Sequence, residues 1–201
     1  MSWIKTINYS KADRYLKNIY KRVKGPDENV DNVLKLHSLR PHTLLGHMTL
    51  YKSVLHHSAN VLPKWYLEAI GVYVSHWNKC DYCVQHHSAG LSRLLNDIDK
   101  EKQFFRALRK NKPETYFDAK YLEGIHYARK LTIAPSTMVK ADFTKLKEAG
   151  FAEGEILEIN QVVSYFNYVN RSVLGLGANT QGDILGLSPK DSDNAENWNH
   201  S

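Results

Sequence analysis

Residues 153–174 hold the sequence feature that most restricts the fold, an apolar stripe with helical spacing. Ile156, Ile159, Val163, Phe166, Val169 and Val173 recur at steps of three and four residues, which places them on one face of an α-helix. Gly175 and Gly177 follow the stripe, and glycine often ends a helix because it tolerates a left-handed backbone. We therefore expect the longest helix of the chain here.

Helical signals also cover most of the remaining sequence. Residues 11–23 place Tyr15, Ile19 and Val23 on one face. Pro41 and Pro63 each stand where a helix can begin, because the fixed φ of proline and its missing N–H suit the first turn. Further helices are expected from Pro63 to an interruption at Asn78, from about Cys80, and over 99–110, 116–132 and 142–149. No run alternates as a strand does, so the predicted fold class is all-α.

The 201 residues suit one domain with a buried core. Apolar residues make up 42% and charged residues 24%, which is ordinary for a globular protein. We expect a single helical domain over residues 1–185. Residues 186–201 are polar and show no periodicity, so we expect a C-terminal tail that is loose or docks on a partner subunit.

The net charge is +6, and positive charge gathers in residues 17–25 and 106–113. No nucleic-acid-binding motif accompanies these runs, so we interpret them as solvated helix faces and expect no nucleic-acid partner. No stretch approaches the roughly 20 apolar residues that a membrane helix needs. The N-terminal residues lack the apolar core of a secretory signal. We expect a cytoplasmic location without a membrane partner, where a purely structural disulfide would be unusual.

The two cysteines of the chain stand beside residue types that transfer protons. Cys80 and Cys83 are three residues apart, Glu68 precedes Cys80 by twelve positions, and His87 follows Cys83 by four. Cys83 and His87 therefore share a helix face, and both thiols lie near a helix N-terminus, where partial positive charge favours a thiolate. If the helix bearing Glu68 packs antiparallel to this one, its carboxylate can hold His87 or pass a proton. One thiol could then attack an oxidant and the other form a disulfide with it.

Other interpretations of these cysteines remain open at this point. Two buried cysteines can simply pack as small apolar residues. A zinc site could use both thiols with His87 or His86, but structural zinc prefers four ligands and no second pair exists, so we expect no metal. A thioredoxin-type motif needs a βαβ context that this chain lacks. The glycines of residues 175–182 imitate a dinucleotide-binding pattern but follow a helix, so we expect no nucleotide cofactor.

The spacing E-x11-C-x2-C-x3-H, formed here by Glu68, Cys80, Cys83 and His87, resembles the signature of the alkylhydroperoxidase D-like proteins. These belong to the carboxymuconolactone decarboxylase superfamily. Residues 36–55, 125–135 and 149–177 also look like the peroxidase-related branch of that family, so the resemblance covers most of the chain from about residue 30 to 178.

The resemblance implies an all-helical fold that assembles into trimers or hexamers, and thiol peroxidase chemistry. It implies that Cys83 attacks the peroxide, that Cys80 resolves the product and faces the reductant, and that His87 and Glu68 act as base and relay carboxylate. Some family members carry a histidine between the two cysteines, where this chain has Asp81 and Tyr82.

The leading hypothesis is therefore an enzyme that reduces organic hydroperoxides through a Cys83–Cys80 disulfide and is regenerated by a thiol or dithiol reductant. The alternatives are a non-redox decarboxylase-like enzyme and a redox-sensing oligomer without turnover. We interpret His86 as lying beside the site, because it points about 100° away from His87 around the helix. Asn167 and Asn170 are expected to tie helices together as buried amides.

Overall fold

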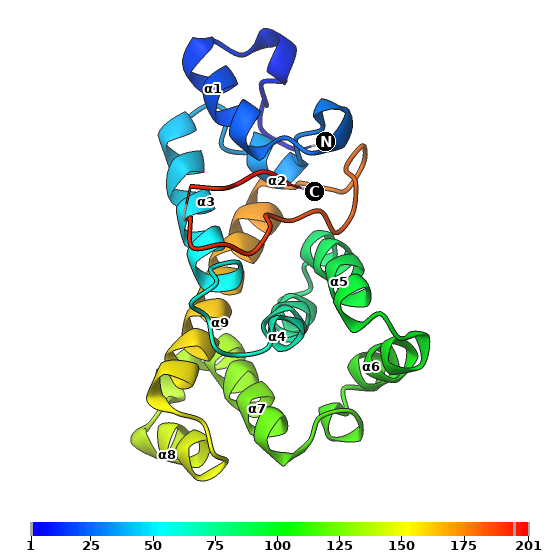
Figure 1. Ribbon diagram of the computed structural model, residues 1–201, viewed down its shortest axis with the longest axis vertical. Helices are drawn as coiled ribbons and strands as arrows, with labels where there is room; N and C mark the ends of the chain where they lie inside the picture. The colour runs from blue at the N-terminus through cyan, green and yellow to red at the C-terminus, as the bar shows by residue number, and fades with distance from the viewer. Residues whose placement is uncertain (1, 195, 201) are drawn as a thin grey trace.

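The computed structural model describes residues 2–194 and 196–200, and no strand occurs among them. The predicted all-α class is confirmed. Short 3-10 turns occupy Tyr9–Lys11, Pro26–Glu28, Pro113–Thr115 and Pro135–Thr137. The α-helices in Figure 1 are α1 (Arg14–Val23), α2 (Asn32–Lys35), α3 (Pro41–Leu55), α4 (Lys64–Trp77), α5 (Asp81–Leu95), α6 (Ile98–Lys110), α7 (Ala119–Ile133), α8 (Lys140–Glu148) and α9 (Glu153–Leu176).

Helix α4 is the centre of the fold. Its residues 66–75 are buried without interruption, and α5, α7 and α9 pack around it (Figure 1). The helix carries little charge, so it can be enclosed on all sides. Gly71 lets α9 approach closely, because a Cβ there would stand 2.1 Å from Cζ of Phe166. The predicted stripe of α9 thus packs directly onto the helix that carries Glu68.

Most predicted boundaries hold within a few residues, and the differences have local causes. Helix α9 continues through Gly175 and ends at Gly177, which adopts φ of 67°. Helix α7 begins at Ala119 rather than residue 116, because the Asp118 carboxylate accepts a hydrogen bond from the Tyr121 N–H and caps the helix there. The predicted buried face of α1 is wrong at Tyr15, which is 49% exposed.

The C-terminal segment, residues 178–200 apart from residue 195, packs against its own chain. It runs beside α2 and α3 in Figure 1, coloured orange to red. Arg93 of α5 donates to the carbonyl oxygens of Leu185 and Gly186 at 2.6 and 2.7 Å. The Trp198 ring is 3% exposed and lies under the Arg22 guanidinium at 3.7 Å. The prediction of a loose tail is therefore wrong for these residues, and docking on a partner subunit stays a prediction.

None of the described helices is both long and apolar enough to cross a membrane.

Candidate active site

Glu68 and His87 form a buried carboxylate–imidazole pair. Glu68 lies in the enclosed middle of α4, is 3% exposed, and accepts a hydrogen bond of 2.8 Å at Oε2 from Nδ1 of His87 on α5. Burial alone would raise the pKa of Glu68, but the adjacent His87 outweighs burial and holds this pKa below its usual range. Because a carboxylate only accepts hydrogen bonds, Nδ1 carries a proton and Nε2 is the basic nitrogen of His87.

A tight turn between α4 and α5 brings these two side chains face to face. Asn78 ends α4, and Lys79 adopts a left-handed backbone with φ of 57°. The Cys80 N–H then donates to the Ser75 carbonyl oxygen at 2.9 Å, which closes α4 with a Schellman motif. Helix α5 begins at Asp81, one residue after the predicted start.

Both cysteines are buried free thiols at the start of α5. The Cys83 thiol donates a hydrogen bond to the Cys80 sulfur and the Cys83 backbone N–H donates to it as well, so both lower the pKa of Cys80. That donated hydrogen bond, together with burial, raises the pKa of Cys83 well above its ordinary value. In the reduced protein the hydrogen bonds from the Cys83 thiol and the Cys83 N–H therefore favour a thiolate on Cys80 over one on Cys83.

Asn170 of α9 fixes the turn and the thiols relative to each other. Its Oδ1 accepts from Nδ2 of Asn78 at 2.9 Å, and its own Nδ2 donates to Oγ of Ser75 at 3.1 Å. A side-chain hydrogen bond with Asn170 also lowers the pKa of Cys83, though less than burial raises it. Asn167 accepts from the same Asn78 amide at 3.0 Å. The interpretation as a buried amide that ties helices together is confirmed for Asn170, which is fully buried, whereas Asn167 is only partly buried.

Glu68, Cys83 and His87 line one small cavity of about 50 Å³. A space of this size holds about four water molecules. Cys80 instead lines a separate depression of about 190 Å³, together with Asp81 and Gln85. The four predicted residues are therefore brought together, and the two buried cysteines line different pockets.

Aromatic and histidine rings from α3 and α9 form another wall of the cavity. The rings of Tyr51 and Tyr165 stack at 5.4 Å between centroids, and the His47 ring lies 5.8 Å from Tyr165. Burial lowers the pKa of His47 to about 3, so this imidazole is neutral near physiological pH. Sequence reasoning missed all three residues, because their spacing does not separate them from other core positions.

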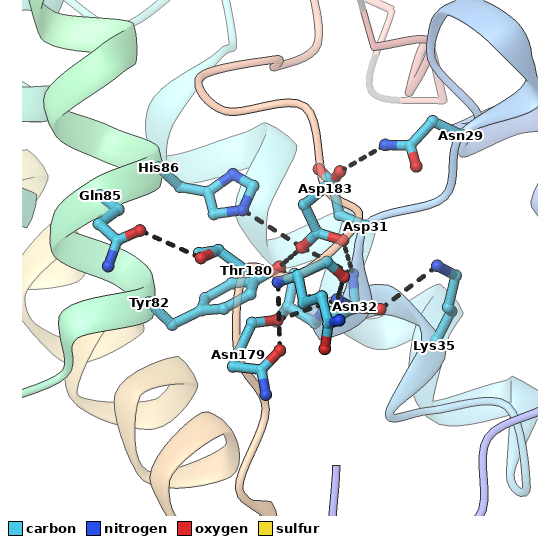
Figure 2. A network of polar contacts seen from close by, with 12 residues as sticks. Asn29, Asp31, Asn32, Lys35, Tyr82, Gln85, His86, Asn179, Thr180 and Asp183 are labelled. Atoms are coloured by element: carbon cyan, nitrogen blue, oxygen red, sulfur yellow. Dashed lines mark hydrogen bonds and ion pairs between the residues drawn. The ribbon is translucent and has the colours of Figure 1, made fainter. Parts of the chain in front are cut away.

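Asp183 and His86 form a second carboxylate–imidazole pair, which is drawn in Figure 2. Oδ2 of Asp183 accepts from Tyr82 Oη at 2.6 Å and lies 3.3 Å from Nε2 of His86. Asp183 also accepts from the Asn32 N–H at 3.1 and 3.0 Å. His86 and Tyr82 both line the cavity, so the interpretation of His86 as lying beside the site is wrong.

A further acid, Asp31, lines the same cavity and lies beside Asp183 in Figure 2. Burial, helped by the neighbouring Asp183 charge, raises the pKa of Asp31 to about 6, although His86 acts in the opposite direction. No sequence spacing links Asp31 or Asp183 to the cysteines.

The C-terminal segment closes the cavity. Leu187, Ser188 and His200 line it, and Nδ1 of His200 donates to the Trp198 carbonyl oxygen at 2.8 Å. Burial lowers the pKa of His200 to about 4, which leaves its ring neutral near physiological pH. Across the described residues, no group of three or more His, Cys, Asp or Glu side chains is arranged to hold a metal ion.

Comparison with solved structures identifies the fold. An uncharacterized peroxidase-related protein from Ralstonia eutropha JMP134, described as an alkylhydroperoxidase AhpD core, superposes with a TM-score of 0.75 at 20% identity over 89% of this chain and 92% of that chain. An uncharacterized peroxidase-related protein from Silicibacter sp. TM1040 gives 0.67 at 26% identity, over 85% and 86% of the two chains. The debrominase Bmp8 gives 0.69 at 17% identity, over 88% and 91%.

No protein-family model and no curated protein matches the sequence. The similarities in structure confirm the predicted helical fold, and they cover nearly the whole of each matched chain.

Proposed function

We propose that this chain, an alkylhydroperoxidase D-like protein by its fold, is a thiol-dependent peroxidase that reduces small organic hydroperoxides. One observation supports this most directly: Cys83 lines a small cavity together with His87, whose basic nitrogen is determined by a hydrogen bond to a buried carboxylate, Glu68. A thiol beside an oriented base is the arrangement that nucleophilic cysteine chemistry needs.

In the first step, Nε2 of His87 takes the proton of the Cys83 thiol. The thiolate attacks the terminal oxygen of the hydroperoxide, so that an S–O bond forms and the O–O bond breaks. Cys83 becomes a sulfenic acid and the alkoxide leaves. Ionised Glu68 stabilises the protonated His87 ring formed in this step, because the two groups are joined by a hydrogen bond of 2.8 Å.

In the second step, Cys80 attacks the sulfenic sulfur of Cys83, forms the disulfide, and releases hydroxide, which takes the proton held by His87. The lowered pKa of Cys80 suits this role, because a thiolate is ready to resolve the sulfenic acid without a further base. A dithiol reductant then exchanges with the disulfide and returns both thiols. We propose that it approaches Cys80 from the surface depression that Asp81 and Gln85 help to line.

The cavity size favours a substrate of few heavy atoms. At about 50 Å³ the cavity accommodates tert-butyl hydroperoxide more readily than the larger cumene hydroperoxide. A variant of the debrominase that shares this fold was solved with 2,3,4-tribromopyrrole. We propose a peroxide for this chain instead, because Cys80 lies in hydrogen-bond contact with Cys83 and can form a disulfide with it.

We also propose that the enzyme works in the cytoplasm as a homo-oligomer, a trimer or hexamer, as the family resemblance implies.

The test follows loss of tert-butyl hydroperoxide with dithiothreitol as reductant. Cys83→Ser should abolish turnover. Glu68→Gln keeps the shape of the side chain but removes its charge, and should lower kcat/KM roughly 10²–10⁴-fold. Glu123→Gln is the matched control, because Glu123 pairs with a surface histidine, His126, at 3.5 Å, away from the cavity. Turnover by Cys83→Ser at the parent rate, or equal rates for the two glutamate variants, would contradict the proposal.

A further inference from the structure

His86 is placed to reach the same reacting atoms as His87 from another side. It lies three positions after Cys83 on α5, and His87 lies four positions after it, so the two rings flank the thiol on the helix surface. Both rings line the cavity that holds Cys83. The site therefore contains a second imidazole that the proposed mechanism has not used.

The environment of His86 mirrors that of His87. Nε2 of His86 lies 3.3 Å from Oδ2 of Asp183, as Nδ1 of His87 lies 2.8 Å from Oε2 of Glu68. A carboxylate only accepts, so Nε2 of His86 carries a proton. Among the described residues no hydrogen bond to its Nδ1 is found, and the His86 side chain is 10% exposed and lines the cavity. Nδ1 is therefore the atom of His86 that can exchange a proton.

Anchoring of the C-terminal segment does not account for His86. Asp183 is already held by the Tyr82 hydroxyl at 2.6 Å and by the Asn32 N–H, and both bonds are shorter than the one to His86. Tyr82 in turn accepts from the Val33 N–H at 3.1 Å, so the segment is joined to α2 and α5 without an imidazole (Figure 2).

The proposed cycle needs a second proton donor besides His87. Two oxygen leaving groups, the alkoxide and the hydroxide, must each take a proton. The proton of Cys83 passes through His87 and serves one of them. With Cys80 as a thiolate the second proton must come from another group, and His86, which lines the cavity and is held by Asp183 from behind, is the remaining imidazole that has a carboxylate partner there.

We propose that His86 is a catalytic acid that protonates the departing alkoxide through Nδ1, and that Asp183 is its positioning residue. This rests on the proposed peroxidase function. Reduced protein with protonated His86 and a Cys80 thiolate, plus ROOH, gives the disulfide, ROH, water and neutral His86. Hydrogen, oxygen and charge balance in this sum, and the hydroperoxide is the oxidant. The two pairs thus divide the work, with His87 as base and His86 as acid.

Two carboxylates lie near the His86 ring. Oδ2 of Asp183 in the C-terminal segment stands 3.3 Å from its Nε2, and Asp31, which precedes α2, lines the same cavity, whereas burial keeps the neighbouring His200 ring neutral near physiological pH. The Tyr82 ring stacks on the imidazole at 4.6 Å and its phenol stays protonated, because burial raises the pKa of Tyr82 well above its ordinary value.

The test compares two oxidants that differ in the basicity of the leaving group. tert-Butyl hydroperoxide releases a strongly basic alkoxide, which needs an acid, whereas peracetic acid releases acetate, which does not. His86→Gln keeps an N–H donor for Asp183 but has no transferable proton. In single-turnover oxidation of the reduced protein, followed by mass spectrometry of the cysteines, this variant should lose about 100-fold with tert-butyl hydroperoxide and stay within about threefold of the parent with peracetic acid. Asp183→Asn should show the same split with a smaller loss, and His126→Gln on the surface of α7 should change neither rate.

The outcomes separate the two proposals. Equal losses with both oxidants would mean that His86 supports structure, and unchanged rates with both would mean that it has no part in the reaction; either result overturns the acid role and leaves the peroxidase proposal standing. If the parent protein forms no disulfide with either oxidant, the proposed function fails and the acid role fails with it.

Discussion

Replacing Asp31 with asparagine should stabilise the protein, and only above the pH at which the folded carboxyl ionises. Asp31 is 7% exposed, and burial, with the neighbouring Asp183 charge, raises its pKa from 3.8 to about 6. The folded state therefore binds this proton more tightly than the unfolded state. The contribution of protonated Asp31 to the free energy of unfolding is therefore complete below the pKa of the unfolded state. It falls as the pH rises toward 6 and is absent at neutral pH.

The magnitude follows from the shift. Each pKa unit corresponds to about 1.4 kcal/mol, so a shift of about two units costs the folded state up to roughly 3 kcal/mol once the group is ionised. Asparagine has the same shape, remains neutral, and can still accept the hydrogen bond that Asn29 donates to Asp31 at 3.0 Å. Asp31→Asn should therefore raise the free energy of unfolding by about 1–3 kcal/mol at pH near 8 and leave it nearly unchanged at pH near 4.

Urea unfolding at both pH values measures this difference. Asp142→Asn is the contrasting control, because the hydrogen bond from Lys130 lowers the pKa of Asp142, and its contribution to stability is present at neutral pH and lost as the pH falls through the folded pKa. That variant should destabilise at the higher pH. A loss of stability for Asp31→Asn at the higher pH, or an equal change at both, would refute the reasoning.

Three further outcomes follow from the packing and the thiols. Thiolate absorbance titrations should show the lower cysteine pKa lost in Cys80→Ser and kept in Cys83→Ser, because the structure places the stabilised thiolate on Cys80. Trp198→Ala should cost about 3–5 kcal/mol in denaturant unfolding and raise the rate with cumene hydroperoxide relative to tert-butyl hydroperoxide, because the segment that closes the cavity loses its buried ring. Gly71→Ala should lower the melting temperature, with a cost of about 1–3 kcal/mol, because the new methyl group overlaps Phe166.

The sequence predicts what short spacings determine. Helical periodicity identifies most helices. The positions of Glu68, Cys83 and His87 predict a hydrogen-bonded carboxylate–imidazole pair and a nearby thiol, because one tight turn joins the two helices that carry them. The order of the two cysteine pKa values could not be predicted in this way. This order depends on which thiol donates the hydrogen bond between them and on the depth of burial of Cys83. Neither can be inferred from the spacing of residues in the sequence.

The sequence does not predict Asp183 and His200 as site residues, for a different reason. Both lie in irregular backbone after α9, where no periodicity indicates which side chains turn inward, and a polar composition suggests solvent exposure. They are buried because Arg93 and the pairing of Lys64 with Asp191 at 2.5 Å hold the segment against the helices. Contacts separated by about a hundred residues decide this, so the predicted loose tail followed from composition alone.

Consecutive histidines on one helix explain how two proton-transfer pairs can serve one thiol. Residues three and four positions after Cys83 lie on either side of it, about 100° apart around α5, so His86 and His87 cannot share one carboxylate. Each needs an acid from a different element, and the fold supplies Glu68 from the helix before the turn and Asp183 from the C-terminal segment. The first pair is fixed by the hairpin of α4 and α5, and the second depends on closure of the C-terminal segment over the cavity. The proposed base and the proposed acid at Cys83 therefore depend on separate parts of the fold, and we expect a change that loosens the C-terminal segment to impair the acid while leaving the base in place.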